Sequence, residues 1–157
     1  MKSQGRVGLL FLFVVVGTLM LVNLSQAAES SHKINAKGVG LFIGTGSGGT
    51  SETQIIGGGL LQGTARGSTE VTDFTGFPVL VIAGTETFTT NKGTLIVDIE
   101  GTVNLVTGEF VFYGPINGVD GKLYGAYGTL IFEGVQDIGT GVFTEDITGV
   151  MFVDLSP

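Results

Sequence analysis

The stretch GTLIVDIEGTVN, residues 93–104, decides the fold class. Apolar side chains stand at positions 95, 97, 99 and 103, and polar or charged ones stand at positions 94, 98 and 102. This two-residue period predicts a β-strand with one packed face and one wet or polar face. No window after residue 28 sustains the 3.6-residue period of an amphipathic helix. The sequence therefore predicts an all-β protein.

The chain on both sides of this stretch reads as further strands. Gly, Thr, Val, Ile and Phe dominate it, and β-branched and aromatic residues favour strands. The expected strands are residues 36–43, 53–66, 79–89, 93–104, 109–116, 122–133 and 142–153. We expect polar, flexible loops at residues 44–51 and 67–76, and a break or bulge at the three glycines 57–59.

Short glycine-containing connectors at residues 90–93, 105–108 and 138–141 predict hairpins, and hence an antiparallel meander. Closure into a barrel removes the unpaired edges of a meander. Glycines inside the strands suit the sharp coiling of a small barrel. We therefore predict a single antiparallel, calycin-like β-barrel of roughly eight strands. A β-sandwich explains the strands equally well but makes less use of the internal glycines.

The N-terminus has the pattern of a signal peptide. Lys2 and Arg6 precede an apolar stretch of 16 residues at 7–22, and Ser25 and Ala27 fit the −3 and −1 positions of a cleavage site. We expect a signal-peptide helix in residues 1–27, cleavage after Ala27, and one barrel domain in residues 28–157. The alternative is an uncleaved anchor, although 16 residues fall short of the roughly 20 that cross a bilayer. The expected location is secreted or periplasmic, with no stable membrane insertion after cleavage.

Charge and cysteine content limit the possible partners. All 14 acidic residues but only five of the 7 basic ones follow Ala27, so this part carries a formal charge of −9. An acidic surface without a basic run repels phosphate, so we expect no nucleic-acid partner. The sequence has no cysteine, which excludes disulfides and thiol chemistry. An oligomer remains open.

A resemblance to a known group of barrels covers roughly Gly84–Phe152. It is most specific at INGVDGKLYGAYG, residues 116–128, where the spacing matches the pattern I-x-G-G-T-G-x-F-x-G-A-x-G. Val119, Asp120 and Leu123 depart from that pattern. The segment resembles the allene oxide cyclase-like and dirigent-like group of calycin-type barrels. The resemblance implies a barrel of roughly eight strands. Members of this group range from cyclases, in which lumen carboxylates and an occasional arginine guide cyclisation, to proteins with no known reaction.

The candidate catalytic residues are carboxylates on strand faces. Asp98 and Glu100 share the polar face of residues 93–104. Glu133 lies on the expected strand at residues 122–133, and Glu145 lies on the last expected strand, at residues 142–153. Arg66 is a candidate partner for these carboxylates. If that face lines a lumen, a desolvated carboxylate there can act as general acid or base. The alternative is that the polar face is the solvated exterior of the barrel.

The candidate ligand-binding residues are the aromatics Phe110, Phe112, Tyr124 and Tyr127, for which core filling is the alternative. The sequence has one histidine, His32, beside the expected cleavage site, which excludes a histidine-based triad and argues against a zinc site. We expect no metal and no other cofactor.

Three functions fit these observations. The first is a non-catalytic exported barrel that binds a small apolar ligand or a surface partner. The second is a cofactor-free cyclase- or isomerase-like enzyme acting on a hydrophobic substrate in the lumen. The third is a structural protein of the extracellular matrix. Two structural features distinguish these three functions: whether the barrel lumen is solid or hollow, and which carboxylates face the lumen.

Overall fold

A computed structural model describes residues 29–156, and the expected signal peptide of residues 1–27 lies outside this range. The described residues form eight β-strands and two single-turn 3₁₀ helices. Their bounds are β1 Ser30–Gly44, β2 Gly48–Gly57, η1 Gly59–Leu61, β3 Gly63–Asp73, β4 Val79–Thr90, β5 Gly93–Asn104, β6 Glu109–Gly118, η2 Gly121–Leu123, β7 Tyr127–Gln136 and β8 Val142–Val153. None of the described helical segments has the length and apolar character needed to span a bilayer.

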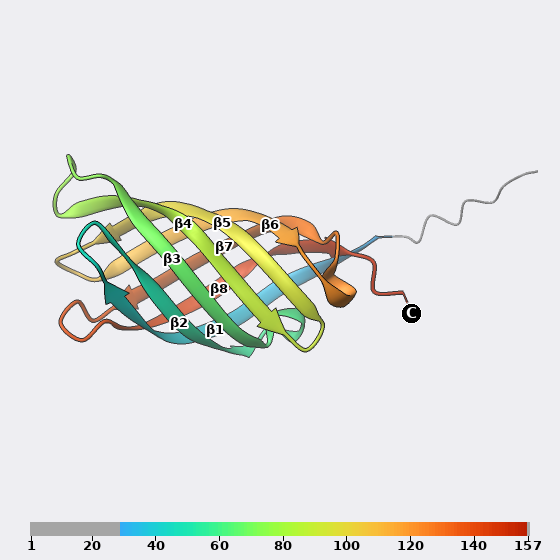
Figure 1. Cartoon of the computed structure of the whole chain (residues 1–157). Coiled ribbons are helices and arrows are strands. Elements are labelled where there is room, and N and C mark those ends of the chain that lie inside the picture. The colour runs from blue at the N-terminus through green and yellow to red at the C-terminus, as the bar shows by residue number, and fades with distance from the viewer. Residues whose placement is uncertain (1–28, 157) are drawn as a thin grey trace, which may run out of the picture.

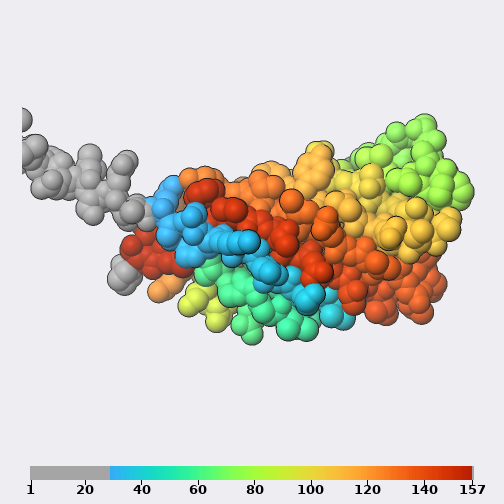
Figure 2. Space-filling model, turned by 180° about the vertical axis from the view of Figure 1, so that it is seen from behind, coloured from blue at the N-terminus to red at the C-terminus, as the bar shows by residue number. Residues whose placement is uncertain are grey.

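The strands follow one another around a closed barrel (Figure 1). Each strand pairs antiparallel with the next, and β8 returns to pair with β1 from Ser30↔Val153 to Leu41↔Val142. Figure 2 shows this seam, with β1 in blue alongside β8 in red. The closing pair leaves neither end of the sheet unpaired. The predicted all-β, single antiparallel barrel is therefore confirmed.

Several predicted boundaries need correction. The expected strand at residues 53–66 is two strands, because the chain reverses at η1. Gly57, Gly58 and Gly59 enter that reversal with φ of 74°, 74° and 56°, a region that other residues rarely adopt. The expected strand at residues 122–133 begins only at Tyr127, because residues 121–123 form η2. The expected loops at 44–51 and 67–76 are shorter, because β2 begins at Gly48 and β3 continues to Asp73.

The small residues of the resembling motif are expected to serve two purposes, positive φ in the turn and close approach of neighbouring strands, and the structure separates the two by position. We expect small residues at 125, 126 and 128 to let neighbouring strands pack closely. This holds at Gly128, where a Cβ would collide with the carbonyl of Val150. A Cβ on Gly125 meets nothing within 4 Å, so crowding does not select that glycine. Gly125 instead has a φ of 77°, which strains any other residue.

The interior divides along the barrel axis into a solid half and a hollow half. Near the chain termini a continuous cluster fills the lumen, with Phe88, Leu95, Leu130 and Met151 among its fully buried members. Towards the other end a smaller cluster lines the wall and consists of Leu80, Ile82, Val103, Phe110 and Phe143. The alternation predicted for residues 93–104 holds, with positions 95, 97, 99 and 103 buried and 98, 100 and 102 exposed.

Candidate functional site

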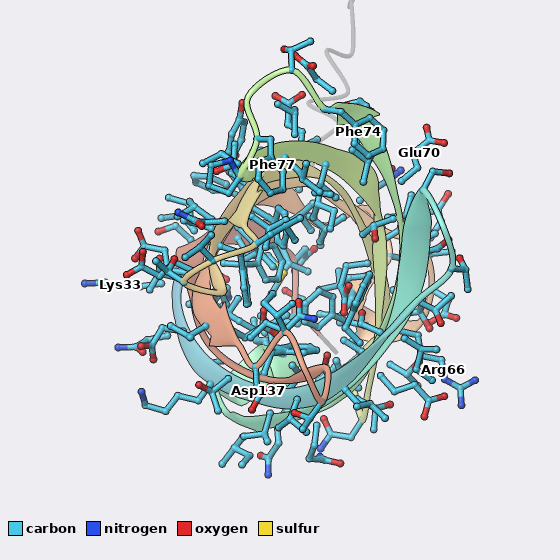
Figure 3. The ribbon with its side chains drawn as sticks, turned by 90° about the vertical axis from the view of Figure 1, so that its left-hand side faces the viewer. Lys33, Arg66, Glu70, Phe74, Phe77 and Asp137 are labelled. Carbon is cyan, nitrogen blue, oxygen red and sulfur yellow. The ribbon has the colours of Figure 1, made fainter. Side chains whose placement is uncertain are left out.

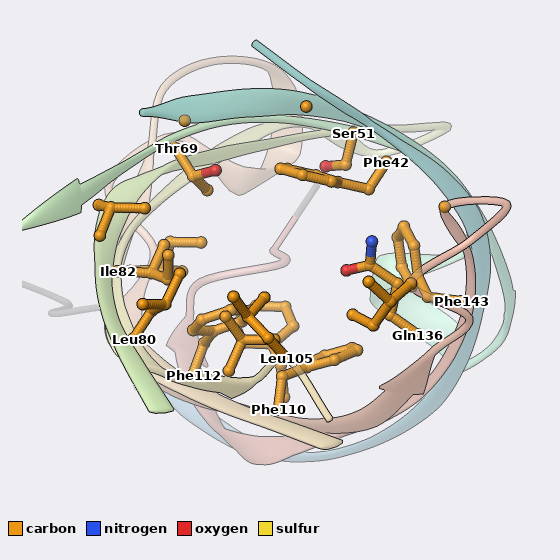
Figure 4. Close-up of a pocket in the computed structure, with 18 of the residues that line it drawn as sticks. Phe42, Ser51, Thr69, Leu80, Ile82, Leu105, Phe110, Phe112, Gln136 and Phe143 are labelled. Atoms are coloured by element: carbon orange, nitrogen blue, oxygen red, sulfur yellow. The ribbon is translucent and has the colours of Figure 1, made fainter. Parts of the chain in front are cut away.

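A cavity of about 560 Å³ occupies the hollow half of the barrel. Its mouth lies among the loops that join β1 to β2, β3 to β4, β5 to β6 and β7 to β8, the end that faces the viewer in Figure 3. Phe74, Leu105 and Ile138 stand at this mouth. Figure 4 shows the open centre of the lumen with Phe42, Leu80, Phe110 and Phe143 around it. A cavity of this size and apolar character suits a small hydrophobic molecule.

Glycines on neighbouring strands explain why this half is hollow although its side chains are large. A Cβ on Gly40 would collide with the ring of Phe143, and a Cβ on Gly134 would collide with the ring of Phe110. Each ring therefore occupies space that a side chain on the adjacent strand would otherwise fill. The aromatic side chains lie against the wall instead of crossing the lumen, and the centre stays open.

Two carboxyl groups lie where the hollow half meets the solid half. On β4, Glu86 lies between inward-facing Ile82 of the cavity wall and Phe88 of the solid core. On β8, Glu145 lies between Phe143 and Ile147 in the same way. Both glutamates line the cavity, and Glu86 is only 8% exposed.

Two residues on β2, Ser51 and Thr53, lie between these carboxyls along one side of the wall. Ser51 Oγ donates a long hydrogen bond of 3.5 Å to Glu86 Oε2, and both atoms fill the space over Gly67 on β3. The Thr53 side chain and the Glu145 carboxyl together fill the space over Gly38 on β1. We call Glu86, Ser51, Thr53 and Glu145 the polar arc. All four residues line the cavity.

The Thr53 hydroxyl has no partner within the described residues. Its Oγ1 atom is buried and forms no hydrogen bond, and the residue is only 4% exposed. A buried hydroxyl without a partner costs about 1–3 kcal/mol. The unpartnered Thr53 hydroxyl is therefore a local cost of the folded state at the cavity wall.

The electrostatics of the lumen favour protonated carboxyls. Burial, the larger cause, and the negative charge of Glu145 together raise the pKa of Glu86 from 4.5 to about 8, while the Ser51 hydrogen bond opposes the rise. Burial raises the pKa of Glu145 from 4.5 to about 7. Glu145 therefore releases its proton first, and its charge then helps to keep Glu86 protonated. Near neutral pH the pair offers one acid and one base.

The structure places the four predicted catalytic residues outside the cavity. Asp98, Glu100 and Glu133 are exposed on the outer face, because the inward positions of β5 and β7 carry apolar side chains. Glu100 accepts a hydrogen bond of 2.6 Å from the Tyr113 hydroxyl. The Arg66 side chain is 78% exposed and pairs with Glu52 at 3.1 Å, and Figure 3 shows it pointing away from the barrel. All four residues therefore lie on the solvated exterior of the barrel, which was the alternative interpretation of the polar face.

The four predicted ligand-binding aromatics divide evenly. Phe110 and Phe112 line the cavity, and their rings stack with centroids 5.2 Å apart. Tyr124 is 77% exposed beside η2. Tyr127 is exposed on β7, stacks on Phe152 at 5.1 Å and donates a hydrogen bond to Glu29. The two tyrosines are therefore not part of the cavity wall.

Sequence reasoning missed Glu86, although its local sequence carried a signal. Within residues 79–90, the inward positions 80, 82, 86 and 88 read Leu, Ile, Glu and Phe. A carboxylate in phase with apolar residues on both sides belongs to the packed face of its strand. Glu145 shows the same pattern between Phe143 and Ile147.

The described residues offer little for a metal. Within residues 29–156 no three His, Cys, Asp or Glu side chains cluster closely enough to hold one. The described cavity wall contains no His, Cys, Met or Tyr side chain. The side-chain groups of this wall that contain potential metal ligands are the carboxyls and hydroxyls of the polar arc, the Thr69 and Thr140 hydroxyls and the Gln136 amide.

Fold and site together define an antiparallel barrel with an apolar lumen that holds a carboxyl pair. No protein-family model matches the sequence, and no curated protein matches it significantly. Solved structures do share the fold. One is a nonspecific heme-binding cyclase that catalyses (4 + 2) cycloaddition during neoabyssomicin biosynthesis, with a TM-score of 0.55 at 15% identity over 82% of this chain and 68% of that one.

A second is the Diels Alderase AbmU from Streptomyces koyangensis, with a TM-score of 0.54 at 15% identity over 83% of this chain and 70% of that one. At this identity the likeness establishes the fold alone. Of the predicted resemblance to the allene oxide cyclase-like and dirigent-like group, the comparisons therefore support the coarser part, a barrel fold like that of the cyclase described above. Neither of these two proteins is an allene oxide cyclase or a dirigent protein by its description.

Proposed function

We propose that the barrel is a cyclase- or isomerase-like enzyme that binds a hydrophobic small molecule in its lumen and moves protons through Glu86 and Glu145, without a cofactor. One observation carries the proposal: two carboxyls with pKa values of about 8 and about 7 lie at the base of an apolar cavity. Burying two acids together costs folding free energy near neutral pH, whereas apolar residues would not. Perturbed acids in a cleft are typical of functional sites.

The proposed chemistry is proton transfer next to a polarised double bond. The Glu145 carboxylate removes a proton from a carbon adjacent to a carbonyl or imine group. The carboxylic acid of Glu86 gives its proton to the carbonyl oxygen or imine nitrogen, which leaves a neutral enol or enamine. Transfer of the proton held by Glu145 to another carbon, with the enol or enamine proton returning to Glu86, gives an isomer. Attack of the enol or enamine carbon on a carbonyl carbon closes a ring: the C=O π bond breaks, its oxygen takes the proton held by Glu145, and the enol or enamine proton returns to Glu86. A base and an acid with pKa values near neutrality suit both directions of transfer.

One of the two similar structures is described as a cyclase and the other as a Diels Alderase, which supports ring closure as a class of reaction. Because a (4 + 2) cycloaddition moves no proton, the carboxyl pair alone supports the proton transfer. A non-catalytic carrier is the second candidate, because the aromatic wall and the 560 Å³ cavity suit binding alone. The two candidates differ in one property. An enzyme needs the ionised carboxylate of Glu145 to reach the bound molecule, whereas a carrier needs only the apolar wall.

A probe reaction separates the two candidates. 5-Nitrobenzisoxazole is a neutral aromatic molecule that isomerises to a coloured cyanonitrophenolate when a base removes one C–H proton and the N–O bond breaks. We expect the protein to accelerate this reaction, with a rate that rises between pH 6 and 8 as Glu145 ionises. General-base catalysis contributes about 10²–10⁴-fold, so Glu145→Gln should lower the rate at least tenfold.

The matched control is Glu133→Gln, the same change on the exposed outer face, which should leave the rate unchanged. Binding of the neutral dye Nile red is measured in parallel. If Nile red binds with equal affinity to wild type and Glu145→Gln but neither accelerates the probe reaction, the carrier is the correct account. A rate that Glu133→Gln lowers as much as Glu145→Gln would also contradict the proposed base.

A further inference from the structure

The polar arc differs in character from the rest of the described cavity wall. The opposite side, on β5 to β7, is apolar except for Gln136 at the end of β7, and it includes Ile99, Phe112 and Phe132. The arc carries two acids and two hydroxyls, and the described wall contains no Lys, Arg or His side chain. A ligand that fills this lumen therefore needs an apolar body and one polar end, and that polar end meets hydrogen-bond acceptors and negative charge.

The arc places two carboxyl groups on the wall of the lumen, one on each side of β2. The Thr53 methyl carbon Cγ2 lies beside the Glu145 carboxyl over Gly38. The Glu86 carboxyl lies beside Ser51 over Gly67, and Ser51 and Thr53 are inward-facing neighbours on β2. A primary ammonium group has three N–H donors and no acceptor, and ionised carboxylates accept hydrogen bonds without donating any. Hydrogen bonds from a charged donor to a carboxylate are about twice as strong as neutral ones.

We infer that the lumen selects a molecule with an apolar body and one basic nitrogen, a primary amine or the corresponding imine, bound at the polar arc; this inference rests on the proposed function. An apolar acid of the same shape is excluded, since its carboxylate would meet Glu145 with no cation on the described wall to compensate. The surplus of 14 acidic over 7 basic residues in the chain also favours entry of a cation over an anion.

The selection should depend on pH in one direction. Glu86 and Glu145 are the titratable side chains of the described cavity wall. Because burial raises both pKa values, the wall is uncharged at pH 5 and gains negative charge between pH 6 and 8. The amine remains protonated across this range. Amine affinity should therefore rise with pH, while the affinity of a neutral alcohol stays constant.

Three ligands with one common body test the inference: 4-phenylbutylamine, 4-phenylbutan-1-ol and 4-phenylbutanoate, each titrated calorimetrically into the full chain at pH 5 and pH 8. At pH 8 we expect the amine to bind at least tenfold more tightly than the alcohol, and the acid at least tenfold more weakly. At pH 5 the advantage of the amine over the alcohol should fall to threefold or less. This wild-type comparison needs no folded variant.

Variants then locate the preference. Glu145→Gln and Glu86→Gln should each reduce the ratio of amine affinity to alcohol affinity at pH 8, and Glu133→Gln should leave this ratio unchanged. Equal binding of all three ligands would overturn the inference but leave a hydrophobic lumen ligand in place. Absence of binding by all three, and by Nile red, would overturn the proposed function as well. A preference that survives in both lumen variants would arise from the overall charge of the protein and would overturn the inference.

Discussion

Raising the pH should destabilise this barrel in a window set by two residues. The pKa values of Glu86 and Glu145 rise from 4.5 to about 8 and about 7 in the folded protein. Between pH 4.5 and pH 8 the folded state therefore holds more protons than the unfolded chain. Under that condition the free energy of unfolding falls as pH rises. The contribution of these two carboxyl groups to the free energy of unfolding is fully present below pH 4.5 and is lost as the pH rises through their folded-state pKa values of about 7 and about 8.

The size of the effect follows from the pKa values. At roughly 1.4 kcal/mol for each pH unit, a rise from 4.5 to about 8 corresponds to about 5 kcal/mol for Glu86. The rise to about 7 corresponds to about 3 kcal/mol for Glu145. Because a domain typically has about 5–15 kcal/mol in total, a loss of several kcal/mol between pH 5 and pH 9 is readily measured.

Urea unfolding followed by far-UV circular dichroism at pH 5, 7 and 9 gives this free energy directly. We expect the wild type to lose several kcal/mol across the range. Glu86→Gln should be less sensitive to pH and more stable than the wild type at pH 9, and the double Gln variant should be nearly insensitive in this window. Glu133→Gln should follow the wild type, because its side chain is exposed. A wild type as stable at pH 9 as at pH 5 would refute the reasoning.

Three further predictions test other parts of the account. Thr53→Val removes the unpartnered hydroxyl and should raise the free energy of unfolding in urea by about 1 kcal/mol, while a loss of more than 1 kcal/mol would mean that this hydroxyl has a partner. Gly67→Ala should push the Glu86 carboxyl into the open lumen and thereby weaken the pH dependence of stability. Gly44→Ala is the control, because the nearest atom to its added Cβ is 3.7 Å away, and it should leave the pH dependence unchanged. Equal effects of the two variants would contradict the close contact over Gly67. Intact mass of the exported protein should show a chain beginning at Ala28, and a mass that retains residues 1–27 would favour the uncleaved anchor.

The fold could be predicted because it depends on local pattern. The alternation of residues 93–104 identified one strand, and glycine-containing connectors identified hairpins that pair sequential strands. The position of a chain reversal was harder to predict from the sequence. The reversal after β2 uses three glycines with positive φ, which read equally well as a bulge inside one strand.

The candidate site was harder to predict, because it depends on register between strands far apart in the chain. Glu145 lies beside Thr53 only because β8 closes on β1 with Gly38 opposite Glu145, and a register shift of one residue would turn the glutamate outward. Asp98 and Glu100 looked suitable because they share a polar face, but a polar face that alternates with a packed one faces water. The informative residues were the carboxylates on apolar faces.

A titration of the glutamate carboxyl groups tests the central claim most directly. The protein is labelled with ¹³C at the glutamate carboxyl carbons, and the carboxyl chemical shifts are followed by NMR from pH 3 to pH 10. The account predicts two signals with midpoints at about 7 and about 8, one absent from Glu145→Gln and the other from Glu86→Gln. If every glutamate carboxyl titrates near its ordinary value of about 4.3, the buried pair does not exist as described and the proposed acid–base function fails with it.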